Sequence, residues 1–400
     1  MGIARGREQC PEVDVDVVPP SWEVSTQAGE LGVQQYTRSP SMQQILFEQY
    51  QIPLPPTDLE AIQSIVREQE ILSSLATIED HCDCLTWRRQ AAHHGTQVCA
   101  LFDRNILSDV LSLVRPASCG LLVQCSDRGR IGAAMMAFLQ VSNVVIEPSS
   151  ALYEAADSAP EELRLFRAAD NVRPEIYADI ALGRRDFLGR NDLPEYSSPL
   201  PIVDFHKPIT GRKKFYIAVL KIAELELSKR SSVEKMEAFL RWTYDEFLFL
   251  PSAILLAASH LTDRRAGSLL KSLRTKDRAK ALTNIRNAVW DLQVIQEWCR
   301  RTQKQNTENR YWLLCSRDRA LKKIARTTLF SGSDADAKRL GLEFFQQHWG
   351  HQKGEALADL LAKFLSDKDN PARRANSDPP VGYLDGLVAQ LEKTILRWPE

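Results

Sequence analysis

Two aspartates each follow an apolar run with the length and composition of a buried strand. Asp103 ends QVCALFD, and Asp318 lies just beyond YWLLCS. In an open parallel sheet, ligands bind in the crevice outside the carboxyl ends of the strands. Carboxylates brought to such an edge from distant parts of the chain would be hard oxygen ligands for Mg²⁺ or Mn²⁺. The simpler interpretation of Asp318 is a surface ion pair with Arg317 or Arg319.

A third acid lies on a predicted amphipathic helix, KALTNIRNAVWDLQVIQEW (280–298). Asn284, Asn287 and Asp291 are spaced i, i+3 and i+7, so they share a face of that helix. Polar groups that flank a buried face often point into a cleft, although a solvated helix face gives the same pattern. The apolar stripe beside them consists of Leu282, Ile285, Val289, Leu292 and Ile295.

Glu154 is the fourth candidate, in an early turn of the helix predicted at SSALYEAA. The helix dipole favours an acid near a helix N-terminus, and that effect alone is a sufficient structural explanation. Glu154 therefore matters only in combination with the other three acids.

Segments typical of strands and helices alternate from residue 97 onward. The helix NILSDVLSLV follows the first strand and would be capped by Asn105. This alternation predicts an α/β fold in which a central, mostly parallel sheet carries helices on its faces. Strands are predicted at 97–103, 119–125, 143–148 and 311–316.

The chain divides into four parts by composition and periodicity. We expect residues 1–56, rich in Pro, Ser, Gln and acids, to form an extended or poorly ordered arm. Residues 57–96 read as a helical N-terminal segment and 97–330 as the α/β domain. A mostly helical insertion at 158–280 interrupts that domain, and residues 331–400 form a helical C-terminal segment.

Composition indicates a soluble globular protein and excludes an argument from overall charge. Charged residues are 26% of the chain and the net charge is −1, so any case for nucleic acid must rest on local patches.

Several of the eight cysteines lie in apolar runs, as reduced intracellular cysteines do. Cys82 and Cys84 lack the second ligand pair of a structural zinc site, although His93 and His94 follow them. The most apolar segment (247–261) is too short to span a bilayer, and we expect a cytoplasmic protein.

Two basic runs could contact a polyanionic backbone. One spans 264–286, with eight Lys or Arg against the single acid Asp277, and the other follows Asp318. A solvated helix face is the ordinary explanation of such runs. The residues are Arg264, Arg265, Lys271, Arg274, Lys276, Arg278, Lys280 and Arg286 in the first run, and Arg317, Arg319, Lys322, Lys323 and Arg326 in the second.

The order of these motifs resembles that of PIN-domain ribonucleases. LFDRNIL resembles the opening strand–helix of that family, in which an Asp ends the strand and an Asn follows one residue later, here Asp103 and Asn105. WDLQVIQEW and the later CSRDRAL resemble the closing half, with Asp291 on a helix and Asp318 two residues after Ser316. The resemblance covers about 97–157 and 281–330, and the long insertion between these parts departs from the small members of the family.

The resemblance implies a three-layer α/β/α PIN-like domain and a metal-dependent nuclease. Asp103, Asp291 and Asp318 would hold Mg²⁺ or Mn²⁺, together with Glu154 or, failing that, Glu147. The expected substrate is single-stranded or structured RNA, with DNA open to the same chemistry.

Supporting roles follow from the same resemblance. Asn105 and Ser316 would orient the acids, as would Asn287. From the two basic runs, independently of the resemblance, the residues expected to contact the substrate backbone are Arg317, Arg319, Lys276 and Arg278.

The main alternative is a catalytically silent PIN-like scaffold that binds RNA or protein through its helical insertion. The sequence leaves open a homo-oligomer or a regulatory protein partner, and it indicates no membrane partner.

Overall fold

The computed structural model describes residues 49–74, 81–194, 203–207, 209, 211–263, 269–329, 334–370, 373 and 382–398. Most of the predicted N-terminal arm lies outside these described residues, as do Arg264 and Arg265.

A four-stranded sheet forms the centre of the α/β part, in the order β1-β4-β2-β3. β2 (Gln97–Phe102) lies between β4 (Arg310–Cys315) and β3 (Val145–Glu147), and it is parallel to both. In β2 and in β4 every residue after the first is buried, as expected for parallel strands covered on both faces. The short β1 (Leu72–Ser73) pairs antiparallel with β4, so the fold is mixed α/β with a mainly parallel sheet.

The strand predicted at 119–125 is wrong. Residues 121–123 are exposed and irregular, with Leu122 65% accessible. The preceding helix runs on to Ser118, and Gly120 then takes a left-handed turn at φ 73°. This turn directs the chain away from the sheet, so the apolar run has no neighbouring strand to pair with.

Helices pack around the sheet and bring the first acid to its edge. α4 (Arg104–Ser118) begins directly after β2, and its N-cap is Asp103 rather than the predicted Asn105. α4 packs closely on α5 because Gly132 has no side chain: a Cβ there would lie 3.0 Å from the backbone of Asp109. The other helices of this part are α2 (Pro56–Glu68), α3 (Cys84–His94), α5 (Asp127–Val141), α6 (Ser149–Glu154), α7 (Ala159–Asp170) and α8 (Pro174–Ala181).

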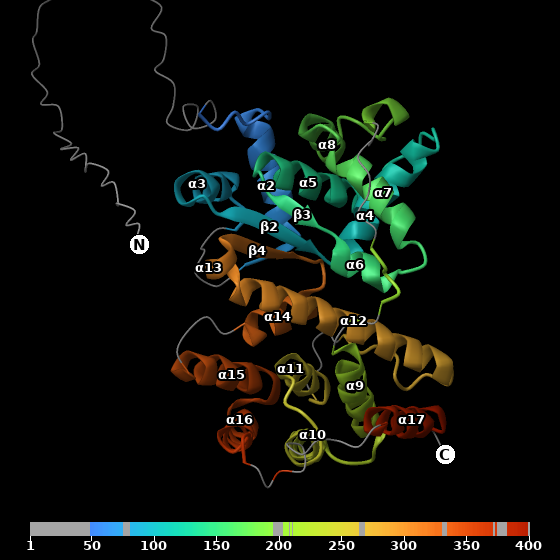
Figure 1. The fold of residues 1–400 in the computed structure, drawn as a ribbon, viewed down its shortest axis with the longest axis vertical. Helices are drawn as coiled ribbons and strands as arrows, with labels where there is room; N and C mark the ends of the chain where they lie inside the picture. Colours follow the sequence, from blue (N-terminus) through green and yellow to red (C-terminus); the bar gives the residue numbers. More distant parts are fainter. Residues whose placement is uncertain are drawn as a thin grey trace, which may run out of the picture.

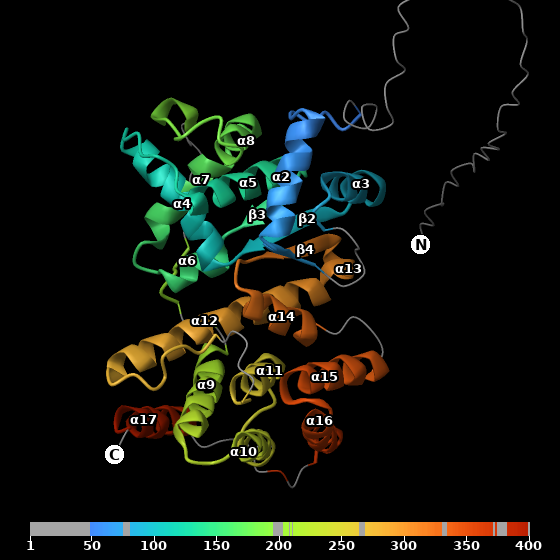
Figure 2. The same ribbon diagram turned by 180° about the vertical axis from the view of Figure 1, so that it is seen from behind.

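The insertion at 158–280 is mainly helical, and it divides between two sides of the molecule. α7 packs on α4 and α8 on α5, whereas the helices from residue 212 onward lie across α12 (Arg278–Gln303) from the sheet (Figures 1 and 2). These later helices are α9 (Arg212–Leu227), α10 (Ser232–Asp245) and α11 (Pro251–His260).

The C-terminal helices pack against α9, α11 and α12. α15 packs on α16 and on α11, and α17 packs on α9 and α12. The buried apolar residues of the sheet, the insertion and the C-terminal segment belong to one core cluster. The remaining elements are a 3-10 turn (Arg190–Asp192), α13 (Gln305–Glu308), α14 (Arg319–Thr328), α15 (Asp334–Trp349), α16 (His351–Ser366) and α17 (Tyr383–Leu396).

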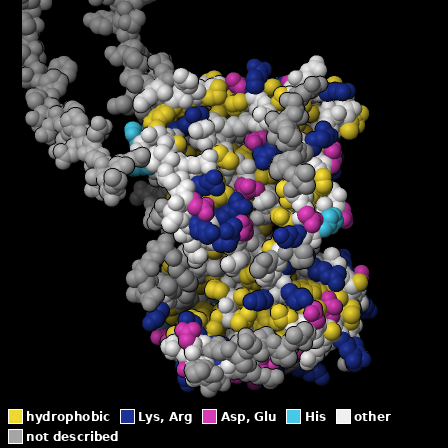
Figure 3. All heavy atoms as spheres, viewed as in Figure 1, with side chains coloured by type: hydrophobic (Ala, Val, Ile, Leu, Met, Phe, Trp, Pro, Cys, Tyr) yellow, Lys and Arg dark blue, Asp and Glu magenta, His cyan; other side chains and the backbone are white. Residues whose placement is uncertain are grey.

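The apolar segment at 247–261 forms part of the hydrophobic core. Every residue of α11 after Pro251 is buried, and Phe247 stacks on Trp242 with ring centroids 4.6 Å apart. Within the described residues, no helix combines the length and the apolar character needed to cross a bilayer. On the face seen in Figure 3, basic and acidic side chains are interspersed, in keeping with the near-zero net charge.

Candidate metal centre

Asp103 and Ser316 join the ends of the two central strands. The backbone N–H of Asp103 donates to the carbonyl of Cys315 at 3.0 Å, which extends the β2–β4 ladder by one residue. The Ser316 hydroxyl donates to Oδ2 of Asp103 at 2.7 Å, and the Asn105 amide donates to the same oxygen. Asp103 is buried, and its carboxylate accepts hydrogen bonds from the Asn105 amide and the Ser316 hydroxyl, which are both neutral donors.

Asp318 begins the helix that follows β4. Its Oδ1 accepts from the backbone N–H groups of Ala320 at 2.8 Å and Leu321 at 3.1 Å, so Asp318 is the N-cap of α14. Its own N–H donates to the Ser316 hydroxyl at 3.0 Å. Asp103 and Asp318 are thus helix caps in equivalent positions, and one serine links them.

Arg317 and Arg319, the arginines considered as ion-pair partners of Asp318, pair with other acids. Arg317 pairs with the buried Asp109 of α4 at 2.7 Å, and Arg319 pairs with Glu70 at 3.0 Å. The backbone N–H of Arg317 also donates to the side-chain amide oxygen Oδ1 of Asn105 at 3.0 Å. The neighbouring arginines therefore hold α4 and the α2–β1 turn instead of neutralising Asp318.

The other two acids come from α12 and α6, which pack on each other. Burial raises the pKa of Asp291 well above its usual range, and the negative charges of Asp103, Asp318 and Glu154 raise it further. Burial and the charge of Asp103 raise the pKa of Glu154 to about 7, although Arg104 and Arg212 oppose the shift. Burial likewise raises the pKa of Asp103, and repulsion from Asp318 adds to it. The fold thus brings together four carboxylates that repel one another.

Glu147, the alternative fourth acid, has different neighbours. Its side chain accepts from the Ser149 N–H at 2.9 Å and lies 3.7 Å from the guanidinium of Arg301. Glu154 is the acid whose charge acts on Asp291, so the arrangement favours Glu154 over Glu147 as the fourth member.

The four carboxylates do not form a ready coordination shell. Within the described residues, no group of three or more His, Cys, Asp or Glu side chains is placed so that it could hold a metal ion as it stands. The acids are close enough to shift one another's pKa, yet Asp103 and Asp318 are turned toward N–H and O–H donors. A shared ion would require side-chain rotation at this edge of the sheet.

Two of the predicted substrate contacts have internal roles. Arg278 donates to the carbonyls of Leu273, Thr275 and Ile395, and Arg317 pairs with Asp109. Lys276 and Arg319 are exposed on the surface.

Asn287 is also exposed on α12. Among the hydrogen bonds of the described residues, none joins it to the four acids. Its predicted orienting role therefore finds no contact in this structure.

Three cations near the acids were not among the four residues singled out as substrate contacts, although Lys271 belongs to the first basic run. Arg212 lies over the ring of Trp290 at 3.9 Å, next to Asp291, and its charge acts on Glu154. Arg104 acts on Glu154 and Lys271 on Asp291. Arg212 follows a Gly at the start of a basic helix, but that local signal carries no information about which distant acid the helix faces.

No protein-family model, characterised protein or solved structure matches this chain.

Proposed function

We propose that this chain is a metal-dependent nuclease with a PIN-like α/β core. Asp103, Glu154, Asp291 and Asp318 would together hold one or two Mg²⁺ or Mn²⁺ ions at the carboxyl ends of β2 and β4. The parallel pairing of these strands, with helices following each, supports the PIN-like, three-layer arrangement.

The mutual repulsion of the four carboxylates carries the proposal. They come from four separate elements. Hydrophobic packing gives no reason for negative charges to gather at one edge of the sheet. Like charges held at a partly buried site destabilise each other, and divalent cations would remove that cost. The donor set is made of oxygen only, which suits Mg²⁺ or Mn²⁺ better than zinc or copper.

A bound divalent ion would polarise the phosphodiester and activate a water molecule. The residues of the chain have more specific tasks. Asn105 and Ser316 hold the Asp103 carboxylate at the strand end. Glu154, with a pKa of about 7, is the acid that can hold or release a proton near neutral pH.

The cations around the acids support a phosphodiester substrate. Arg212 lowers the pKa of Glu154 and Lys271 that of Asp291, so both lie near enough to attract a phosphate toward the acids as well. Arg104 also lowers the pKa of Glu154, but its guanidinium is paired with the buried Glu162. We propose RNA as the substrate, and the same contacts would serve a DNA strand.

The test is cleavage of end-labelled single-stranded RNA and DNA by the purified chain with Mn²⁺, with Mg²⁺ and with EDTA. We expect cleavage with either metal, none with EDTA, and a loss of about 10²-fold or more in Asp291→Asn. The matched control is Asp359→Asn, at an exposed acid of α16 away from the site.

Two results would contradict the proposal. Cleavage that survives Asp291→Asn and Asp318→Asn would place the activity elsewhere or in a contaminant. Failure to cleave any substrate with Mn²⁺ would favour a silent scaffold that binds RNA or protein.

A further inference from the structure

A pocket of about 770 Å³ lies beside α14, facing the turn between α2 and β1. It is separate from the four-acid cluster, although it shares α14 with Asp318. On its other side the pocket is lined by Leu340 and Phe344 of α15.

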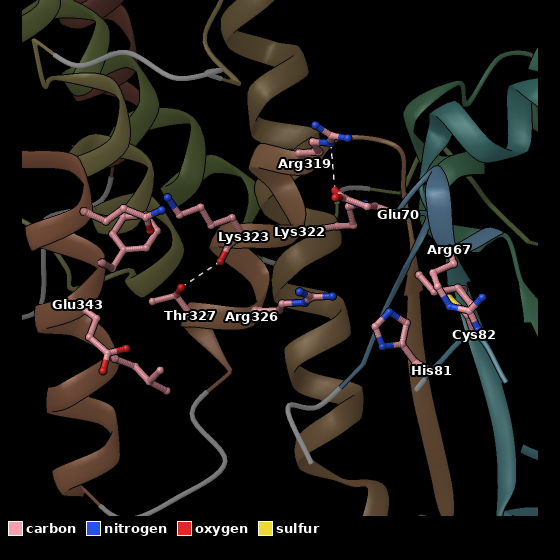
Figure 4. A pocket seen from close by; sticks show the side chains of 14 residues that line it. Arg67, Glu70, His81, Cys82, Arg319, Lys322, Lys323, Arg326, Thr327 and Glu343 are labelled. Atoms are coloured by element: carbon pink, nitrogen blue, oxygen red, sulfur yellow. Dashed lines mark hydrogen bonds and ion pairs between the residues drawn. The ribbon is translucent and has the colours of Figure 1, made fainter. Parts of the chain in front are cut away.

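α14 supplies most of the charge of this pocket. Arg319, Lys322, Lys323 and Arg326 stand at i, i+3, i+4 and i+7, and all of them line it. In Figure 4, Arg319, Lys322 and Arg326 extend from α14 toward the side of Glu70 and His81.

The acids that line the pocket already have cationic partners. Glu70 pairs with Arg319 at 3.0 Å, and Glu343 pairs with Arg339 at 2.7 Å. The positive charge of Lys322 and Arg326 is therefore not balanced by these ion pairs.

Lys322 indicates that the pocket is built for an anion. Its side chain is 5% exposed, and Nζ has no hydrogen-bond partner among the described residues. A buried ammonium without a partner carries a large desolvation cost, which an anion in the pocket would offset. Burial lowers the pKa of Lys322 to about 8, with Arg326 and Arg319 adding to the effect and Glu70 opposing it.

Lys323 is held at the edge of the same pocket. Its Nζ lies 2.8 Å from Nε2 of His348 and 5.2 Å from the centre of the Phe344 ring. Burial, with the charge of Lys323, lowers the pKa of His348 to about 4, so the imidazole is neutral and can accept this hydrogen bond.

We propose that this pocket binds a phosphate-bearing ligand of nucleotide size, with Lys322 and Arg326 contacting the phosphate. The volume is that of a small-molecule site and exceeds the need of inorganic phosphate alone. Leu72, Leu340 and Phe344 provide apolar surface for the rest of the ligand. The ligand is either a free nucleotide or the 5′-phosphorylated terminal nucleotide of a strand, and the site does not depend on the proposed nuclease activity.

The experiment measures binding to the full chain in EDTA by calorimetry and by the change in Tm. The probes are ADP, adenosine, and a trinucleotide with either a 5′-phosphate or a 5′-hydroxyl. We expect a phosphorylated probe to bind and its unphosphorylated counterpart to bind at least about tenfold more weakly, because charge-assisted hydrogen bonds are lost. Binding of ADP identifies a free nucleotide, and binding of only the phosphorylated trinucleotide identifies a strand end.

Four variants make the test specific. Lys322→Met should weaken binding about tenfold or more, and Arg326→Gln should weaken it severalfold. Arg241→Gln, at an exposed arginine of α10, is the matched control and should bind as the parent does. Asp291→Asn should also retain binding, which separates this pocket from the acid cluster.

Equal binding of adenosine and ADP, unchanged binding by Lys322→Met, or no binding of any probe would overturn the proposal. Lys322→Met should fold, because it removes a buried charge. If it does not, Arg326→Gln decides the outcome, since Arg326 is exposed and its replacement leaves the core intact.

Discussion

Asp291 is both a proposed metal ligand and a carboxylate that the neighbouring acids repel. Its carboxylate is repelled by three other acids, so the charge that would serve metal binding destabilises the metal-free fold. The same residue should therefore have opposite effects on stability with and without metal.

We predict that Asp291→Asn raises the Tm of the metal-free chain, by about 2 °C for each 1 kcal/mol of relieved repulsion. The same variant should lose the stabilisation that Mn²⁺ gives the parent chain, which is about 2.7 kcal/mol at a hundredfold excess over Kd. Thermal unfolding in EDTA and in Mn²⁺ measures both effects. A lower Tm in EDTA would show that Asp291 has a favourable partner, contrary to this description.

Glu154 should make metal binding depend on pH. The pKa of its carboxyl group is 4.5 in the unfolded chain and about 7 in the fold, so between these pH values the folded chain binds more protons than the unfolded chain. The stability of the metal-free chain should therefore fall as pH rises through that window.

Mn²⁺ requires the ionised carboxylate, so its affinity should rise about tenfold from about pH 6 to about pH 8. Calorimetric titration measures this slope, and Glu154→Gln should flatten it. An unchanged slope in Glu154→Gln would assign the titration to another group.

At the scale of elements, Asp318 has two separable tasks. It caps α14 through two backbone N–H groups, and it contributes a negative charge to the cluster. Asn can cap a helix as Asp does, but it carries no charge.

We predict that Asp318→Asn keeps or raises the stability of the metal-free chain, because the cap is retained and repulsion of Asp103 and Asp291 is relieved, and that it loses metal-dependent cleavage. Asp318→Ala should lose cleavage and also about 1 kcal/mol of stability, because the cap is removed. Denaturant unfolding and cleavage assays on both variants distinguish the tasks. Equal stability of the two variants would show that the cap contributes little.

The contact of α4 with α5 allows a second test at this scale. A Cβ at Gly132 would lie 3.0 Å from the Asp109 backbone, whereas a Cβ at Gly386 of α17 meets no atom within 4 Å. Gly132→Ala should cost about 1–3 kcal/mol through overpacking, and Gly386→Ala should be neutral or stabilising by up to about 1 kcal/mol. Denaturant midpoints of the two variants measure the difference, and equal midpoints would mean that the helices separate at little cost.

At the scale of the whole molecule, the C-terminal helices complete the core of the insertion. α17 packs on α9 and α12, and Lys213 of α9 pairs with Asp385 at 2.7 Å. The guanidinium of Arg278 reaches from the start of α12 to the carbonyl of Ile395.

We predict that deleting residues 382–400 lowers the Tm of the whole chain and causes aggregation, because the apolar side of α9 loses its cover. Calorimetry and light scattering measure both effects. A truncated chain with unchanged Tm would show that α17 is an independent addition.

The local features of this protein follow from neighbouring residue types. The buried runs of β2 and β4 were predicted because continuous apolar stretches suit strands covered on both faces. Asp103 and Asp318 could be recognised at the strand ends because each closely follows an apolar run, whereas the structure showed that both cap the helix that follows.

Which distant groups meet depends on how the helices pack around the sheet. The tertiary structure directed 119–125 away from the sheet, divided the insertion between two sides, and placed Arg212 over Trp290 and near Glu154. It also buried Lys322 in a pocket although its sequence reads as a solvated basic helix. Such contacts depend on how whole helices pack, and the residue types within one helix do not specify its neighbours.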